Sequence, residues 1–243
     1  MKKVVINLLI LFFTISCSDS ETAIFENSLS FYINNKTIEM GAVISCAASD
    51  ITTNDVLIFY YPEHQVENIR FYETPNAEVD KTDYDSYKRV DLISEPFFNG
   101  YMGKFKKSFA KENWVIITYE LNGEIKLSNP IRIKHLTKPT VWTNDVNINQ
   151  DETTMPEFIW TDNANGDNAI YFQVISNTNN DLLSGTYTYE NHFQYYDTSN
   201  VILNITKQTP PHLTVNTNYK FTLMDVSTDN WVNTIIQKTF TAK

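Results

Sequence analysis

The stretch at residues 114–127, WVIITYELNGEIKL, predicts the fold class of this chain. Its first eight residues are rich in β-branched and aromatic side chains, which favour strands. Asn122 and Gly123 then supply the two positive φ angles that a type I′ turn requires, and residues 124–127 return along the first strand. The stretch therefore predicts an antiparallel hairpin.

Short apolar runs of the same kind recur along the whole chain. Most are about four to eight residues long, are rich in Ile, Val, Thr, Tyr and Phe, and end at Asn, Asp, Pro or Gly, which is typical of strands. Residues 56–61, VLIFYY, are a continuous apolar strand that Pro62 ends. Residues 76–87 are acidic and predict a long exposed connection. We therefore expect an all-β fold.

The composition is that of a globular, acidic protein. Of the 243 residues 42% are hydrophobic, and they include 15 Phe, 14 Tyr and 4 Trp, which excludes a disordered chain. The formal net charge is -10, whereas nucleic-acid binding needs a basic face, so nucleic acid is excluded as a partner.

A domain junction is expected at residues 137–139, because Pro139 cannot pair within a central strand. We expect two tandem β-sandwich domains, an immunoglobulin-like one over residues 28–136 and another over residues 137–243. Four lysines interleave with Phe105 and Phe109 in the first half and predict a charged edge strand that discourages aggregation, with a patch for anionic glycans as the lesser alternative. These lysines are Lys104, Lys106, Lys107 and Lys111.

The second half carries a pattern of single residues along its predicted strands. The pattern consists of Pro139, Trp160, Phe172-x-Val174 and residues 213–219, LTVNTNY. It resembles fibronectin type III domains, which have a Pro-led first strand, a buried Trp on the second and an aromatic-x-Val third. The resemblance implies that Tyr219 forms a tyrosine corner, with its hydroxyl returning to nearby backbone. Asn216 stands where the family has Gly, and Asn tolerates the left-handed turn.

The first seventeen residues read as an export signal. Lys2 and Lys3 precede an apolar run at residues 4–15, which is too short to span a bilayer and fits a signal peptide over residues 1–16. The run ends at Ser16-Cys17 and resembles a bacterial lipoprotein signal of the Bacteroidota type. The resemblance implies acyl chains on Cys17, an acidic tether over residues 17–27, and anchoring in the outer membrane with exposure at the cell surface.

The sequence holds no motif for catalysis, cofactor binding or metal binding. We therefore expect no enzyme activity, no catalytic residue, no cofactor and no metal. Residues 162–168 are rich in oxygen ligands, but Phe172 stands where a calcium loop needs its Glu, so a polar turn is expected. Cys46 lies in an apolar run and is expected to be a buried, inert thiol.

Aromatic residues give the binding hypothesis. Trp231 follows Asp229 and Asn230 in the expected loop between the last two strands, where an exposed ring can stack on a sugar or anchor a protein contact. Tyr195 belongs to a second aromatic group at residues 187–196, which is either a second ligand surface or strand packing.

Three functions remain open at this point. The first is a non-catalytic surface lipoprotein that binds, adheres or acts as a spacer, with a glycan or a surface protein as its partner. The second is glycan capture for a polysaccharide-uptake system, since Phe158-Ile159-Trp160-Thr161 resembles a segment of SusE-like lipoproteins. The third is a weak or accessory surface hydrolase, which needs a cleft lined by carboxylates.

Overall fold

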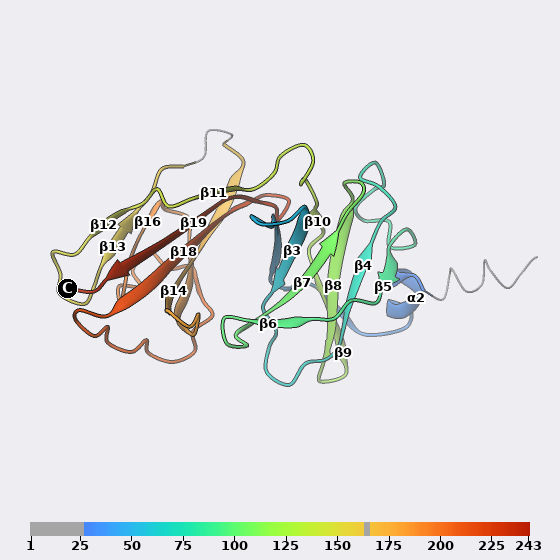
Figure 1. Cartoon of the computed structure of the whole chain (residues 1–243). Helices are drawn as coiled ribbons and strands as arrows, with labels where there is room; N and C mark the ends of the chain where they lie inside the picture. Colours follow the sequence, from blue (N-terminus) through green and yellow to red (C-terminus); the bar gives the residue numbers. More distant parts are fainter. Residues whose placement is uncertain (1–26, 163–165) are drawn as a thin grey trace, which may run out of the picture.

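The computed structural model describes residues 27–162 and 166–243, and its strands form two β-sandwiches joined end to end (Figure 1). The predictions for the signal peptide, for Cys17 and for tether residues 18–26 lie outside the described residues. Within the described part, no helix has both the length and the apolar character needed to cross a membrane.

The first sandwich consists of two sheets and one short helix. Its outer sheet has the order β1 (Ile38–Val43), β9 (Glu124–Ser128), β8 (Trp114–Leu121), β4 (Glu67–Glu73) and β5 (Lys88–Val90), with β10 (Ile131–Arg132) also pairing with β8. Its inner sheet has the order β2 (Ser45–Ser49), β3 (Asp55–Tyr60), β7 (Met102–Ser108) and β6 (Glu95–Phe97). Strand β1 runs parallel to β9, whereas β2 pairs antiparallel with β3. The consecutive strands β1 and β2 thus belong to different sheets, β1 to the outer and β2 to the inner one.

The second sandwich pairs a six-stranded sheet with a three-stranded sheet. The large sheet has the order β11 (Val141–Thr143), β19 (Val232–Thr241), β18 (Asn218–Ser227), β14 (Asn168–Asn177), β15 (Leu182–Thr188) and β17 (Leu203–Asn204). The small sheet consists of β12 (Asn147–Asn149), β13 (Glu157–Ile159) and β16 (His192–Gln194). The expected all-β fold of two sandwiches is therefore confirmed.

The turns that the sequence predicted form as expected. Asn122 and Gly123 have φ angles of 54° and 81°, which join β8 to β9 by the predicted hairpin turn. The Tyr219 hydroxyl accepts a hydrogen bond from the Thr214 amide at 2.9 Å, which is the predicted tyrosine corner. Asn216 has a φ of 62°, as its place in the turn requires.

Helix α2 (Leu29–Ile33) covers the outer face of the first sandwich. The Ser28 hydroxyl caps the helix by accepting a hydrogen bond from the Phe31 amide at 3.2 Å. Leu29 and Tyr32 are buried against side chains of β4, β8 and β9. The helix closes an apolar cluster that the outer sheet alone would expose to water.

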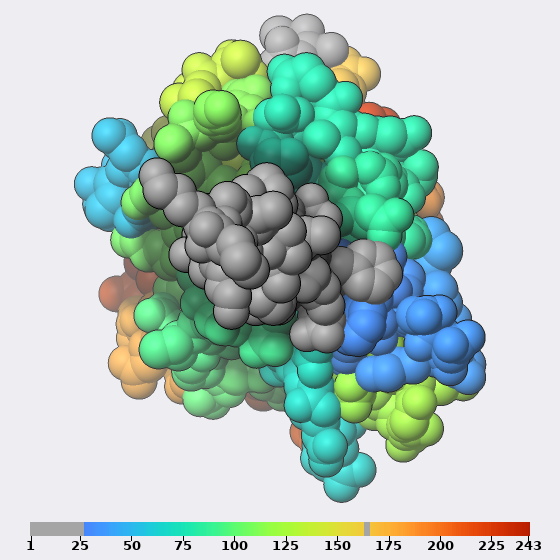
Figure 2. Space-filling view, turned by 90° about the vertical axis from the view of Figure 1, so that its right-hand side faces the viewer, coloured from blue at the N-terminus to red at the C-terminus, as the bar shows by residue number. Residues whose placement is uncertain are grey.

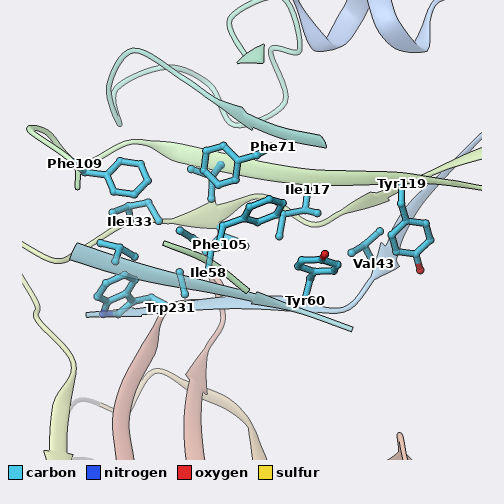
Figure 3. Close-up of a cluster of buried hydrophobic side chains, with 14 residues drawn as sticks. Val43, Ile58, Tyr60, Phe71, Phe105, Phe109, Ile117, Tyr119, Ile133 and Trp231 are labelled. Carbon is cyan, nitrogen blue, oxygen red and sulfur yellow. The ribbon is translucent and has the colours of Figure 1, made fainter. Parts of the chain in front are cut away.

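The cores of the two sandwiches continue into one another. One face of β3 points into the first sandwich with Val56, Ile58 and Tyr60, of which Figure 3 labels Ile58 and Tyr60. Phe59, on the other face, packs toward the second sandwich. The residues that we call the interdomain core pack between the inner sheet and the large sheet; they include Cys46, Ala48, Phe59, Met102, Phe172, Val174, Tyr187, Met224, Val232 and Ile235. The unbroken apolar run at residues 56–61 follows from burial of β3 on both faces.

Strand β7 corrects one prediction. It was expected to be an edge strand, but it lies between β3 and β6, and its residues 102–104 pair with β6. Its lysines form salt bridges: Lys104 with Glu95 at 3.1 Å, and Lys107 with Glu73 at 2.9 Å. The lysines therefore neutralise acids of neighbouring strands rather than guarding a free edge along this part of β7.

Candidate functional site

Trp231 was predicted to face a ligand, and the structure corrects this. The residue lies at the tip of the β18–β19 hairpin, is fully buried, and belongs to the core of the first sandwich (Figure 3). Its indole Nε1 donates a hydrogen bond to the Lys138 carbonyl at 2.8 Å. The ring therefore belongs to the second sandwich by its place in the chain but fills space in the core of the first. We call it the Trp231 plug.

Asp229 and Asn230, also predicted to bind ligand, hold this plug in place. The Asp229 carbonyl accepts from the Arg132 amide at 2.9 Å, and its carboxylate pairs with Lys134 at 2.6 Å. The Asn230 carbonyl accepts from the Ala47 amide at 3.0 Å, and its side chain donates to the Pro130 carbonyl at 3.1 Å. Their polar groups are therefore engaged with the first sandwich.

Tyr195 is also buried, in the core of the second sandwich. Its hydroxyl donates to the Pro211 carbonyl at 2.7 Å, and burial raises the pKa of the phenol. Of the same aromatic group, Tyr187 stacks on Phe172 in the interdomain core at 4.5 Å between ring centroids. Of the two alternatives for this group, a ligand surface or strand packing, Tyr187 and Tyr195 therefore fit strand packing.

Cys46 is the thiol of the interdomain core, and its predicted burial is confirmed. Desolvation raises the pKa of the thiol to about 12, so it stays protonated at neutral pH. Since the thiolate is the reactive form of cysteine, Cys46 acts here as a small apolar side chain.

A surface groove of about 710 Å³ lies where the two sandwiches meet. We call it the interdomain groove. It is lined by the β2–β3 turn of the first sandwich, by the connection between the sandwiches, and by β11 of the second; the lining residues are Ser49, Asp50, Ile51, Thr53, Asn54, Asp55, Phe109, His135, Leu136, Pro139, Thr140 and Trp142. No local sequence pattern predicts this site, because its walls come from both halves of the chain.

Hydrogen bonds between the sandwiches fix the walls of the groove. The indole Nε1 of Trp142 donates to the Ser49 carbonyl at 2.9 Å, and the Ser49 amide donates to the Thr140 hydroxyl at 2.9 Å. That hydroxyl in turn donates to the Val232 carbonyl at 2.8 Å. The aromatic wall is therefore positioned before any ligand arrives.

Two carboxylates from the β2–β3 connection also line the groove and share one cation. Lys106 pairs with Asp50 at 2.7 Å and with Asp55 at 3.4 Å. Partial burial alone would raise the pKa of Asp50, but the hydrogen bonds from Lys106 and Thr52 outweigh it and lower that pKa. Hydrogen bonds from the Ser108 and Thr53 hydroxyls lower the pKa of Asp55. Both groups remain charged at neutral pH.

His135 lines the groove, and a single hydrogen bond sets the tautomer of its neutral ring. Its Nε2 lies 2.9 Å from the Phe109 carbonyl, which can only accept, so Nε2 donates and Nδ1 carries the lone pair in the neutral ring. No partner among the described residues reaches Nδ1. At the rim, Ile51 and Leu136 are 64% and 62% exposed, so the groove combines apolar contacts with fixed polar groups.

The predicted turn at residues 162–168 is described only in part, because residues 163–165 lie outside the described chain. The Asp167 carboxylate pairs with Lys138 at 2.7 Å and accepts from Asn233 at 2.9 Å. In the described part of the chain, no three His, Cys, Asp or Glu side chains come together as metal ligands would.

Comparisons with known proteins give little. No family model matches the chain, and no curated protein matches it. Among solved structures, the fibronectin(III)-like modules of Clostridium thermocellum CbhA align at 10% identity over 86% of this chain and 90% of that one, with a TM-score of 0.24. A likeness this low does not indicate a shared function.

Proposed function

We propose that this chain is a lipid-anchored, non-catalytic binding and spacer module whose binding surface is the interdomain groove. The observation that carries the proposal is the junction: the Trp231 plug and the interdomain core join two sandwiches into one unit. Cys17 acylation would hold this unit at the outer membrane, and the fixed groove would meet a ligand without reorganising.

The charge state of the groove supports a binding role rather than catalysis. A general acid needs a carboxyl group that stays protonated near neutral pH. The pKa values of Asp50 and Asp55 are both lowered, and Lys106 engages both side chains. These two carboxylates are therefore suited to accepting hydrogen bonds from a ligand.

A glycan is the second candidate function, and Trp142 favours it. An aromatic wall beside carboxylate and amide groups offers stacking for a sugar ring and partners for its hydroxyls. Trp142, Asp55 and Asn54 meet this description in the groove. A protein partner at the cell surface would use the exposed Ile51 and Leu136 instead.

The ligand class is tested by a glycan screen with residues 18–243, which contain every strand described above. Truncation of a central aromatic contact costs at least ~2 kcal/mol, so Trp142→Ala is expected to weaken glycan binding by about 30-fold. Ile51→Arg, at an exposed position, is expected to obstruct the same groove without touching the hydrogen bonds of the walls.

Tyr189→Ala is the matched control, because Tyr189 is an aromatic residue with 62% exposure that does not line the groove. If Tyr189→Ala weakens binding as much as Trp142→Ala does, the groove is not the site. If no glycan class binds the unaltered protein, the protein-contact or spacer role is retained and glycan capture is discarded.

The anchor is tested by labelling cells with an alkyne analogue of palmitate. The chain has two cysteines, so Cys17→Ala is expected to abolish the label on the protein. Cys46→Ala is expected to keep it, because the Cys46 thiol is buried and protonated. Label that persists in Cys17→Ala would refute acylation at this residue.

A further inference from the structure

A pocket beside α2 gathers cations in this otherwise acidic chain. It has a volume of about 190 Å³ and is lined by Lys36, by Arg70 of β4 and by Arg89 of β5, together with aromatic and small polar residues. No acid lines it. The chain has three arginines, and two of them meet here. We call this the Tyr32 pocket, after the ring at its centre.

Tyr32 organises two of these cations. The Arg70 guanidinium lies 3.7 Å from the centre of the Tyr32 ring, and the Lys36 ammonium lies 4.3 Å from it. Behind them Tyr72 stacks on Tyr32 at 6.2 Å. A guanidinium that lies over a ring can still present N–H groups at its edge, and these match the two oxygens of a phosphate or carboxylate. One Arg70 N–H is directed at the Tyr72 hydroxyl, which leaves the others for a ligand.

The charges around the pocket leave room for an anion. Within the described residues neither Arg70 nor Lys36 forms a salt bridge, whereas Arg89 pairs with Asp91 at 2.7 Å in an exposed contact. Such surface pairs are weak and exchange readily. The carboxylate that acts on Arg70 and Lys36 is that of Glu120, and it already accepts hydrogen bonds from Tyr32 at 2.6 Å and Asn68 at 2.9 Å.

The place of the pocket indicates which anion it meets. Asn27, the first residue that the structure describes, lines the pocket. Figure 2 looks onto this end of the molecule, where the segment that carries α2 is blue. Cys17 lies ten positions before Asn27 in the sequence, a reach of at most about 36 Å. Acylation of Cys17 would therefore bring this end close to the membrane surface.

The exposed Phe31 side chain beside the pocket is also suited to a membrane surface. Phe31 lines it and is 45% exposed, while Met40, on the neighbouring β1, is 61% exposed. Basic groups beside exposed apolar side chains are typical of surfaces that rest on lipid headgroups.

We propose that the Tyr32 pocket binds the phosphate of an anionic lipid headgroup and thereby sets which end of the molecule rests on the membrane. The inference depends on the proposed anchoring through Cys17. Arg70 and Arg89 supply the hydrogen bonds to the phosphate oxygens, Lys36 supplies further charge, and Phe31 contacts the acyl boundary. The interdomain groove, on the far side of the first sandwich's sheets, then faces away from the bilayer.

The test uses residues 18–243 without acyl chains and sedimentation with vesicles. Binding is expected to vesicles of phosphatidylcholine with phosphatidylglycerol, and not to phosphatidylcholine alone. Each basic residue near an anionic surface contributes about fivefold in affinity, so Arg70→Gln with Arg89→Gln is expected to weaken binding by about 30-fold. Circular dichroism and thermal melting check that the double variant is folded.

Lys111→Gln with Lys220→Gln removes the same charge from positions outside the pocket, and is expected to leave vesicle binding within about threefold of the unaltered chain. An equal loss in this control, or equal binding to both vesicle types, would overturn the proposal. Millimolar inorganic phosphate that binds the pocket while vesicles do not would overturn the lipid source and assign a soluble phosphate. Because this chain carries no acyl group, failure here leaves the palmitate labelling of Cys17 to decide the anchor separately.

Discussion

Replacement of Trp231 by alanine is expected to lower the free energy of unfolding by about 3–5 kcal/mol, the usual cost of deleting a large buried aromatic side chain. The indole is fully buried in the first sandwich, and its Nε1 hydrogen bond to Lys138 would be lost with it. The carbonyl of Lys138 would then lose its partner inside the junction, which adds to the cost. Urea denaturation followed by circular dichroism measures the change.

Two variants make this result specific. Tyr189→Ala removes an exposed aromatic side chain from the second sandwich, whose β18–β19 hairpin carries Trp231. It is expected to change the free energy of unfolding by no more than about 0.5 kcal/mol. Trp231→Phe keeps a ring in the space but loses the hydrogen bond, and is expected to fall between the two. If Trp231→Ala were no more destabilising than Tyr189→Ala, the plug would not form in solution.

The interdomain core predicts that the two sandwiches unfold together. Calorimetry of the unaltered chain is expected to show one transition, because Phe59 and its neighbours bury the inner sheet against the large sheet. Phe59→Ala is expected to cost about 3–5 kcal/mol and to split that transition into two, since the side chain lies between the sandwiches.

Phe158→Ala is the matched control for coupling. Phe158 is equally buried, but it packs within the second sandwich, stacked on Phe221 at 4.1 Å between ring centroids. The same loss of stability with a single transition is therefore expected. Two transitions in the unaltered chain would contradict a shared core and would make the junction a hinge.

Local chemistry explains what the sequence predicted well. A pair such as Asn122-Gly123 determines its turn through its own φ angles, and Tyr219 reaches a backbone amide five residues away. These features depend on neighbours in the chain, so a single sequence contains the information. The strands and the two sandwiches follow from the same kind of short-range pattern.

Trp231 and Tyr195 could not be placed in this way. An aromatic residue beside Asp and Asn looks the same whether its loop faces solvent or another domain. The signal for the second possibility lay elsewhere, in residues 56–61, whose unbroken apolar run shows that β3 is covered on both faces. The run indicates that both faces of β3 are covered by other parts of the chain. It does not indicate that the β18–β19 hairpin contributes to that cover.

The two proposed binding surfaces were missed for a related reason. Trp142 meets the β2–β3 turn only because the sandwiches dock, and Lys36, Arg70 and Arg89 come from three separate elements. Charge and aromatic patterns along the chain give no sign of such groups. The residues of each surface are far apart in the sequence, and they form a binding surface only after the sheets have assembled.

The Trp231 plug also bears on how the protein is made. The ring that completes the first core lies in the β18–β19 hairpin, 99 positions after Arg132, where β10 of the first sandwich ends. Chains emerge from the ribosome with the N-terminal part first, and domains generally fold in that order. Here the sandwich that is synthesised first lacks one side chain of its core until the β18–β19 hairpin of the second sandwich has been synthesised. Its maturation must therefore wait for the second sandwich, and the two complete their folding as a single event.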